Sequence, residues 1–177
     1  MKTLVRVVVS IIALIAVVGA IAYADGAKQP INHSTTVEGN VSAPPAKVFG
    51  FITNVADAPS WRHDVKAVQV LPPESGQDHW IEDLGHGVTM NFLATGTEPV
   101  SADGTAMRKV LLKDPSYGGT WTYILSPGST PGETHLKITE DGYINPPIYR
   151  FMMAHIFGMT KNLDQYMSDM QAAAIKS

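Results

Sequence analysis

The sequence contains no cysteine among its 177 residues. Disulfides, thiolate nucleophiles, iron–sulfur clusters and cysteine-ligated zinc are therefore excluded, and core packing alone must stabilise a secreted form of the chain. Charge is also scarce, because charged residues make up 16% of the chain and the net charge is −3. This composition lacks the basic footprint of nucleic-acid binding, so we expect no nucleic-acid partner.

Motifs of several common enzyme classes are also missing. The chain has no GxSxG nucleophile elbow and no GxxxxGK[ST] phosphate loop. Its six histidines form no HxxxH or HExxH pair, so we predict no metal site and no cofactor.

A long uncharged segment occupies the N-terminus, from Val7 to Ala24. A helix over these residues would be about 27 Å long, close to the hydrocarbon thickness of a bilayer. Lys2 and Arg6 precede the segment and Asp25 follows it. The positive-inside rule then predicts a cytoplasmic N-terminus and an extracytoplasmic remainder.

Two interpretations of this segment, residues 1–24, stay open. Its length favours an uncleaved single-span membrane anchor. The small residues Ala22 and Ala24 around Tyr23 instead fit a signal peptide that is cleaved after Ala24, which would give a secreted or periplasmic protein. Residues 25–34 are polar, include glycine and proline, and predict a linker.

Residues 35–177 predict one α+β domain. A strand over 35–41 is followed by a short helix that ends near Asp57, and then by strand-like runs separated by turn signals at 65–71, 77–84, 88–98, 105–113, 119–126 and 133–144. Apolar residues at steps of three and four then predict a single amphipathic helix of roughly 28 residues over 146–174. A seven-stranded curved antiparallel sheet around this helix accounts for the pattern, and the gap between them predicts a ligand cavity.

Three stretches carry a resemblance to a known superfamily. They are residues 41–49 (VSAPPAKVF), 57–61 (DAPSW) and 139–146 (TEDGYINP), the last running into YRF at 149–151. In this order and spacing the chain resembles the START/Bet v 1-like (SRPBCC) superfamily, in its polyketide cyclase/dehydrase and lipid-transport branch. The resemblance spans residues 35–174 and implies a helix-grip fold with an elongated hydrophobic cavity.

Glu140 is the most informative ionisable residue. Strand alternation places it on the same face as Leu136 and Ile138, and a buried carboxylate needs a partner or a raised pKa. We predict a structural ion pair between Glu140 and Arg150; the alternative is that Glu140 is a polar anchor or general acid in the cavity, and hence a weak catalytic candidate. The residues predicted to contact a ligand are Trp61, Trp80, Phe92, Trp121, Tyr123, Glu140, Met152, His155 and Met159.

Three functions compete. The leading hypothesis is a binding or carrier protein for an apolar small molecule or lipid, associated with the membrane through its N-terminal segment and of open oligomeric state. The second is a cyclase or dehydratase that acts on a polyketide or similar apolar substrate, with Glu140, His63, His79 and His155 as acid–base candidates. The third is an envelope interaction module without a ligand, which predicts a filled core and an exposed apolar patch larger than roughly a few hundred Å².

Overall fold

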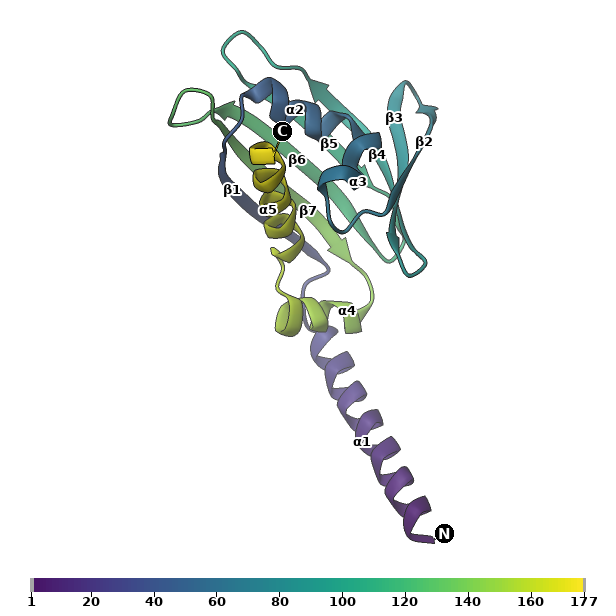
Figure 1. The fold of residues 1–177 in the computed structure, drawn as a ribbon. Coiled ribbons are helices and arrows are strands. Elements are labelled where there is room, and N and C mark those ends of the chain that lie inside the picture. The colour runs from purple at the N-terminus through teal and green to yellow at the C-terminus, as the bar shows by residue number, and fades with distance from the viewer. Residues whose placement is uncertain (1, 177) are drawn as a thin grey trace.

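The computed structural model describes residues 2–176 and consists of a curved antiparallel sheet, helices on its concave face and a protruding N-terminal helix (Figure 1). The α+β helix-grip class is therefore confirmed. The strands are β1 (Asn32–Val41), β2 (Ala67–Glu74), β3 (Gln77–Gly85), β4 (Val88–Glu98), β5 (Ala106–Leu112), β6 (Tyr117–Pro127) and β7 (Thr134–Ile144). The helices are α1 (Lys2–Gly26), α2 (Pro45–Thr53), η1 (Val55–Asp57), α3 (Ala58–Trp61), α4 (Pro147–Met152), η2 (Met153–Phe157) and α5 (Lys161–Lys176).

The strands form one sheet in the order β1-β7-β6-β5-β4-β3-β2. Every pair is antiparallel, and all neighbours except β1 and β7 are consecutive in the chain. The pairing of β1 with β7 brings His33 opposite Gly142 and Val41 opposite Thr134. The first and last strands of the domain are thereby joined in the sheet.

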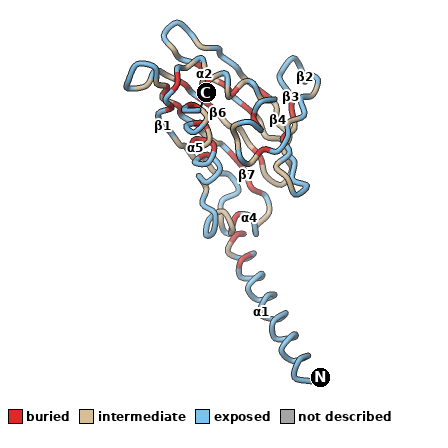
Figure 2. Tube along the Cα trace, viewed as in Figure 1, coloured by how far each residue is buried: buried red, intermediate tan, exposed pale blue. Residues whose placement is uncertain are grey.

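Alternation along β7 sets the core. Leu136 and Ile138 are completely buried, while Lys137 between them is exposed. The buried side of the sheet packs against α5, whose inward residues are Leu163, Tyr166, Met167, Met170 and Ala174. Figure 2 shows the buried residues gathered on the sheet and on α5, while α1 is exposed along most of its length. Each large apolar side chain buried here stabilises the fold by about 1.5–3 kcal/mol.

The prediction of one long C-terminal helix is wrong. The helix divides into α4, the single π-helical turn η2, and α5, with Gly158 between the last two. Gly158 has φ +84°, a left-handed conformation that ends the turn and that glycine adopts without strain. Of the residues that set the predicted apolar stripe, those on α5 pack on the core, but Ile148 and Ile156 are exposed, so the periodicity marked a buried face only in the second half of the segment.

Among the described residues, α1 is the one helix long and apolar enough to cross a membrane by length and composition. It ends at Gly26, and β1 begins at Asn32, so the connection is shorter than the predicted linker of residues 25–34. Its only buried residues are Ala22 and Gly26, which lie where α1 meets α4 (Figure 1).

Candidate ligand-binding cavity

A cavity of about 300 Å³ lies between the concave face of the sheet and the helices. Eight of the nine residues predicted to contact a ligand line it, and they are Trp61, Trp80, Phe92, Trp121, Tyr123, Glu140, Met152 and Met159. The ninth, His155, is exposed and does not line the cavity, because its Nε2 lies 2.8 Å from Oδ2 of Asp25 at the end of α1. Ligand contact by the other eight stays a prediction.

Aromatic rings form much of the wall. Tyr166 on α5 is central, with its ring centroid 5.2 Å from Trp61, 6.0 Å from Trp121 and 5.4 Å from Tyr123. On the β3–β4 side, Trp80 stacks on Phe92 at 5.5 Å. Rings at these distances stabilise one another beyond their buried area and give the cavity a stiff lining. Tyr166 was not among the residues predicted to contact a ligand, although it lies at a helix-spaced apolar position.

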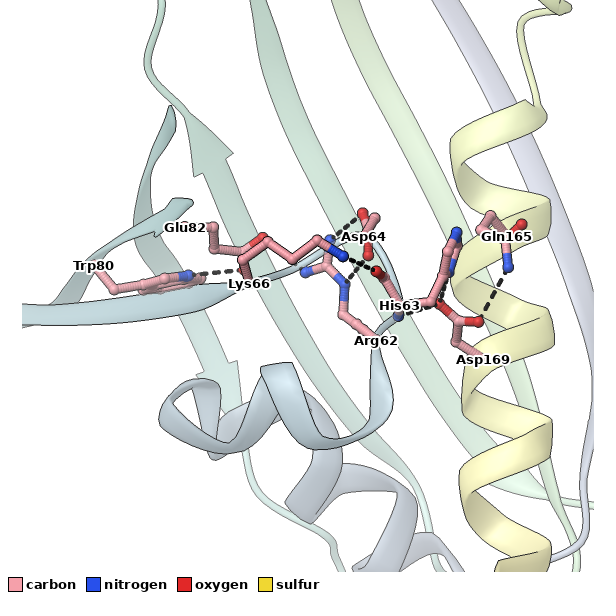
Figure 3. A network of polar contacts seen from close by, with 8 residues as sticks. All are labelled: Arg62, His63, Asp64, Lys66, Trp80, Glu82, Gln165 and Asp169. Carbon is pink, nitrogen blue, oxygen red and sulfur yellow. Dashed lines mark hydrogen bonds and ion pairs between the residues drawn. The ribbon is translucent and has the colours of Figure 1, made fainter. Parts of the chain in front are cut away.

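A partly buried charge network lies beside the aromatic wall (Figure 3). Arg62, directly after α3, donates from Nη1 to Glu82 Oε2 at 2.8 Å and from Nη2 to Asp64 Oδ2 at 2.9 Å. Trp80 donates its indole N–H to the other Glu82 oxygen at 3.1 Å. Glu82 is only 4% exposed, so its charge depends on these donors.

Electrostatics fix the charge state of this network. Burial by itself lowers the pKa of Arg62, but the carboxylates of Glu82 and Asp64 outweigh it, and the net pKa is raised. The guanidinium also lies over the Tyr166 ring, with Cζ 5.3 Å from the centroid. Arg62 is therefore a permanent cation that lines the cavity. Sequence reasoning missed this pair, although Glu82 shares a strand face with Trp80 by simple alternation.

Two phenols adjoin the network. Burial is the main cause of a raised pKa in both Tyr123 and Tyr166. The two side chains therefore stay protonated at neutral pH, and both line the cavity. Hydroxyl groups that are held neutral in a largely apolar cavity can donate to or accept from a polar group of a ligand.

Glu140 lies across the cavity from this network, because β6, β5 and β4 separate β7 from β3. Its Oε1 is 3.6 Å from Nε2 of His33, which comes from the segment predicted as a linker. A side chain at Gly142 would come within 2.7 Å of the His33 ring, so this glycine makes room for the imidazole. His33 and Glu140 form a second polar pair in the cavity wall.

The predicted ion pair between Glu140 and Arg150 is not formed. Arg150 is buried, and its Nε donates to the carbonyl oxygen of Gly26 at 2.9 Å. Its Nη1 donates to the carbonyl oxygens of Ile144 and Asn145 at 2.9 and 2.6 Å. Three backbone acceptors replace the expected carboxylate, so Arg150 joins α1 and the end of β7 to α4.

The remaining acid–base candidates do not line the cavity. His79 Nε2 lies 2.8 Å from Asn91 Oδ1, and His63 Nδ1 lies 2.8 Å from Asp169 Oδ2 on α5. Ligand atoms of His63, Asp64 and Asp169 lie within 4.8 Å of one another, a spacing that a metal ion could bridge. Arg62 already pairs with Asp64, and Asp169 accepts from His63 and Gln165, so hydrogen bonds account for these carboxylates.

A helix-grip fold that encloses such a cavity defines the START/Bet v 1-like class, as the sequence resemblance predicted. The family described as polyketide cyclase/dehydrase and lipid transport matches residues 41–161, and the chain belongs to this family.

Solved structures with the same fold include norcoclaurine synthase from Thalictrum flavum, with a TM-score of 0.60 and 10% identity over 84% of this chain and 97% of that one. The ZhuI aromatase/cyclase from Streptomyces sp. R1128 has a TM-score of 0.61 and 13% identity over 82% of this chain and 94% of that one. A START superfamily protein from Mycobacterium smegmatis has a TM-score of 0.55 and 16% identity over 81% of this chain and 94% of that one. Such low identities show a shared fold alone. No curated protein matches this sequence.

Proposed function

We propose that the protein binds a compact hydrophobic small molecule in the cavity beneath α5. The observation that carries the proposal is the cavity itself, about 300 Å³ in volume and walled mainly by aromatic and aliphatic side chains. That volume is at the lower end of the roughly 300–1,000 Å³ typical of small-molecule sites. It suits an aromatic or isoprenoid-sized compound better than a lipid with two acyl chains. A filled core, which the hypothesis of an interaction module without a ligand requires, does not match this cavity.

The polar groups define the chemistry of the ligand further. Each Nη nitrogen of Arg62 carries two N–H groups and donates one of them to a carboxylate, which leaves a second N–H for a ligand acceptor. The neutral hydroxyls of Tyr123 and Tyr166 lie in the same wall. The ligand is therefore an apolar molecule that carries a carbonyl, hydroxyl or phenol group near one end.

The location that goes with this function is the membrane surface. Ala22 is buried and Asp25 and Gly26 contact the domain, so the end of α1 is part of the folded structure. An uncleaved anchor keeps these contacts on one continuous helix. With Lys2 and Arg6 at the other end of α1, the positive-inside rule supports an extracytoplasmic domain.

A second candidate function is cyclase-like catalysis, which the pair of His33 and Glu140 favours. An imidazole and a carboxylate 3.6 Å apart in one wall of an apolar cavity can together remove a proton from a carbon acid and return one to an oxygen. A cyclase uses the same cavity but releases the ligand chemically changed.

Ligand binding is tested with the full chain purified in mild detergent. We expect native mass spectrometry or organic extraction to recover an apolar compound, and a fluorescent fatty acid to bind with saturation. Leu112→Trp fills the cavity from β5 and should abolish uptake, whereas Ile124→Trp, at an exposed position on β6, should not. Neither recovered ligand nor probe uptake in the unaltered protein, or equal uptake by both variants, would refute the proposal.

The same preparation separates carriage from catalysis. A carrier returns an added poly-β-ketone unchanged, whereas a cyclase returns a ring-closed product that Glu140→Gln and His33→Gln each reduce without loss of binding.

A further inference from the structure

The exposed residues of the cavity wall lie together on one stretch of the chain. Most residues that line the cavity are buried or half-buried, and the exposed ones are Tyr149 on α4, Phe157 at the end of η2 and Asn162 at the start of α5. Tyr149 is 47% and Phe157 is 42% exposed although both also face the cavity. A residue that faces both the interior and the outside forms a rim, so the mouth of the cavity lies along residues 149–162.

The outer surface of this rim is apolar. Ile148 and Ile156 are exposed, the latter at 63%, and they add to the exposed rings of Tyr149 and Phe157. Apolar side chains gathered around the opening of a hydrophobic cavity mark a surface that is covered in use. Lys161 lies beside them with Nζ 4.8 Å from the centroid of the Phe157 ring, which sets one basic group at the edge of the apolar surface.

The rim is also the part of the domain that contacts the N-terminal helix. Arg150 donates to the Gly26 carbonyl at 2.9 Å, and His155 lies 2.8 Å from Asp25. Gly26 packs directly on the backbone of Pro147, where a side chain would overlap the carbonyl group. Figure 1 shows α1 leaving the domain from α4, so an α1 that spans a bilayer holds the rim at the surface of that bilayer.

We propose that α4 and η2 rest on the membrane from which α1 emerges, and that the apolar ligand passes between bilayer and cavity through this mouth without crossing water. The occupant of the apolar surface is the lipid–water interface of the bilayer. The inference rests on the proposed ligand-binding function. It adds the source of the ligand, which is a compound dissolved in the bilayer, and the route by which it reaches Arg62 and the aromatic wall.

The local structure suits this role. A π-helical turn and a glycine in a left-handed conformation separate α4 from α5, while α5 holds its position through Leu163, Met167 and Met170 in the core. The segment between Met153 and Gly158 is therefore separate from the part of α5 that packs on the core.

The absence of cysteine makes a direct test possible. Full-length Ile156→Cys is labelled with an environment-sensitive fluorophore and reconstituted into phosphatidylcholine vesicles that contain a minority of phosphatidylglycerol. Matched controls are Val70→Cys on β2 and Ile175→Cys near the end of α5, both at highly exposed apolar positions away from the rim. We expect a blue-shifted emission and quenching by brominated lipid at position 156 only. Equal emission at all three positions would overturn the proposal.

A transfer assay tests the route. Uptake of a fluorescent apolar probe from vesicles should slow about tenfold in Ile156→Asn. The reason is that the state in which the probe transfers no longer gains the burial of one apolar side chain in the bilayer. Binding of the same probe in detergent should not change, and Ile175→Asn should match the unaltered protein in both assays. An unchanged transfer rate in Ile156→Asn would refute the route while leaving the binding function intact. Loss of binding by the unaltered protein in detergent would instead refute the function on which this inference rests.

Discussion

The buried pair of Arg62 and Glu82 offers a quantitative prediction about stability. Arg62→Met leaves the Glu82 carboxylate with one hydrogen bond, from Trp80, at a position that is nearly inaccessible to water. Removal of one partner of a buried ion pair typically destabilises a protein by about 3–5 kcal/mol. Glu82→Gln is milder, because an amide oxygen still accepts from Trp80 and Arg62 keeps Asp64, so we expect about 1–3 kcal/mol.

The double variant shows whether the two side chains act as a pair. With Arg62→Met and Glu82→Gln together no unpaired charge remains in the buried part of the network, since Asp64, which also loses Arg62, has a side chain that is 41% exposed to water. The loss in free energy of unfolding should therefore fall short of the sum of the single losses by about 1–3 kcal/mol. Urea unfolding of the full chain in mild detergent measures these values. Trp61, Trp80 and Trp121 all line the cavity, so their emission reports the transition. Strictly additive losses would contradict the assignment of a coupled pair.

Three further predictions concern single positions. Burial raises the pKa of Tyr166, so the neutral phenol stabilises the fold fully below the unfolded-state pKa near 10, and this stabilisation is lost as the pH rises beyond it. Tyr166→Phe should therefore make the fall in stability above about pH 10 less steep, by up to about 1.4 kcal/mol per pH unit. Urea midpoints over a pH series measure this slope. Gly26→Ala should loosen the contact with Pro147, lower stability by about 1–3 kcal/mol and speed trypsin cleavage at Lys28, whereas Gly19→Ala, with open space around its Cβ, should do neither. Gly142→Ala should push the His33 ring away from Glu140, with a shift of the imidazole NMR signals and no change in the unfolding cooperativity; unchanged signals would contradict the packing described here.

The sheet was predictable from the sequence because each strand carries its own alternation and each turn its own breaker. Alternation on 133–144 placed Leu136, Ile138 and Glu140 on one face, and β7 has this arrangement. Alternation along residues 119–126 likewise places Trp121 and Tyr123 on one face, and both line the cavity. The pairing of β1 with β7 is known only from the structure, since no local pattern joins segments so far apart in the chain.

The C-terminal region was harder to predict, because the spacing of apolar residues does not show whether another part of the protein packs on them. Ile156 fitted a helical stripe but faces outward beside Gly158, where the chain turns. Arg150 was expected to need a carboxylate, but its acceptors are backbone carbonyls, which no sequence pattern displays. His33 was missed because the polar composition of its segment resembles a linker, whereas its side chain reaches the cavity across a glycine.

Arg150 has a consequence for how sequences of this family can diverge. Its three acceptors are main-chain oxygens of Gly26, Ile144 and Asn145, so most side-chain exchanges at positions 144 and 145 leave those oxygens in place. The connection therefore survives mutation at one side without a compensating change at the other. Related chains that keep this arrangement need to share only the arginine and a glycine that fits against Pro147. Co-variation between pairs of positions would therefore not reveal the contact.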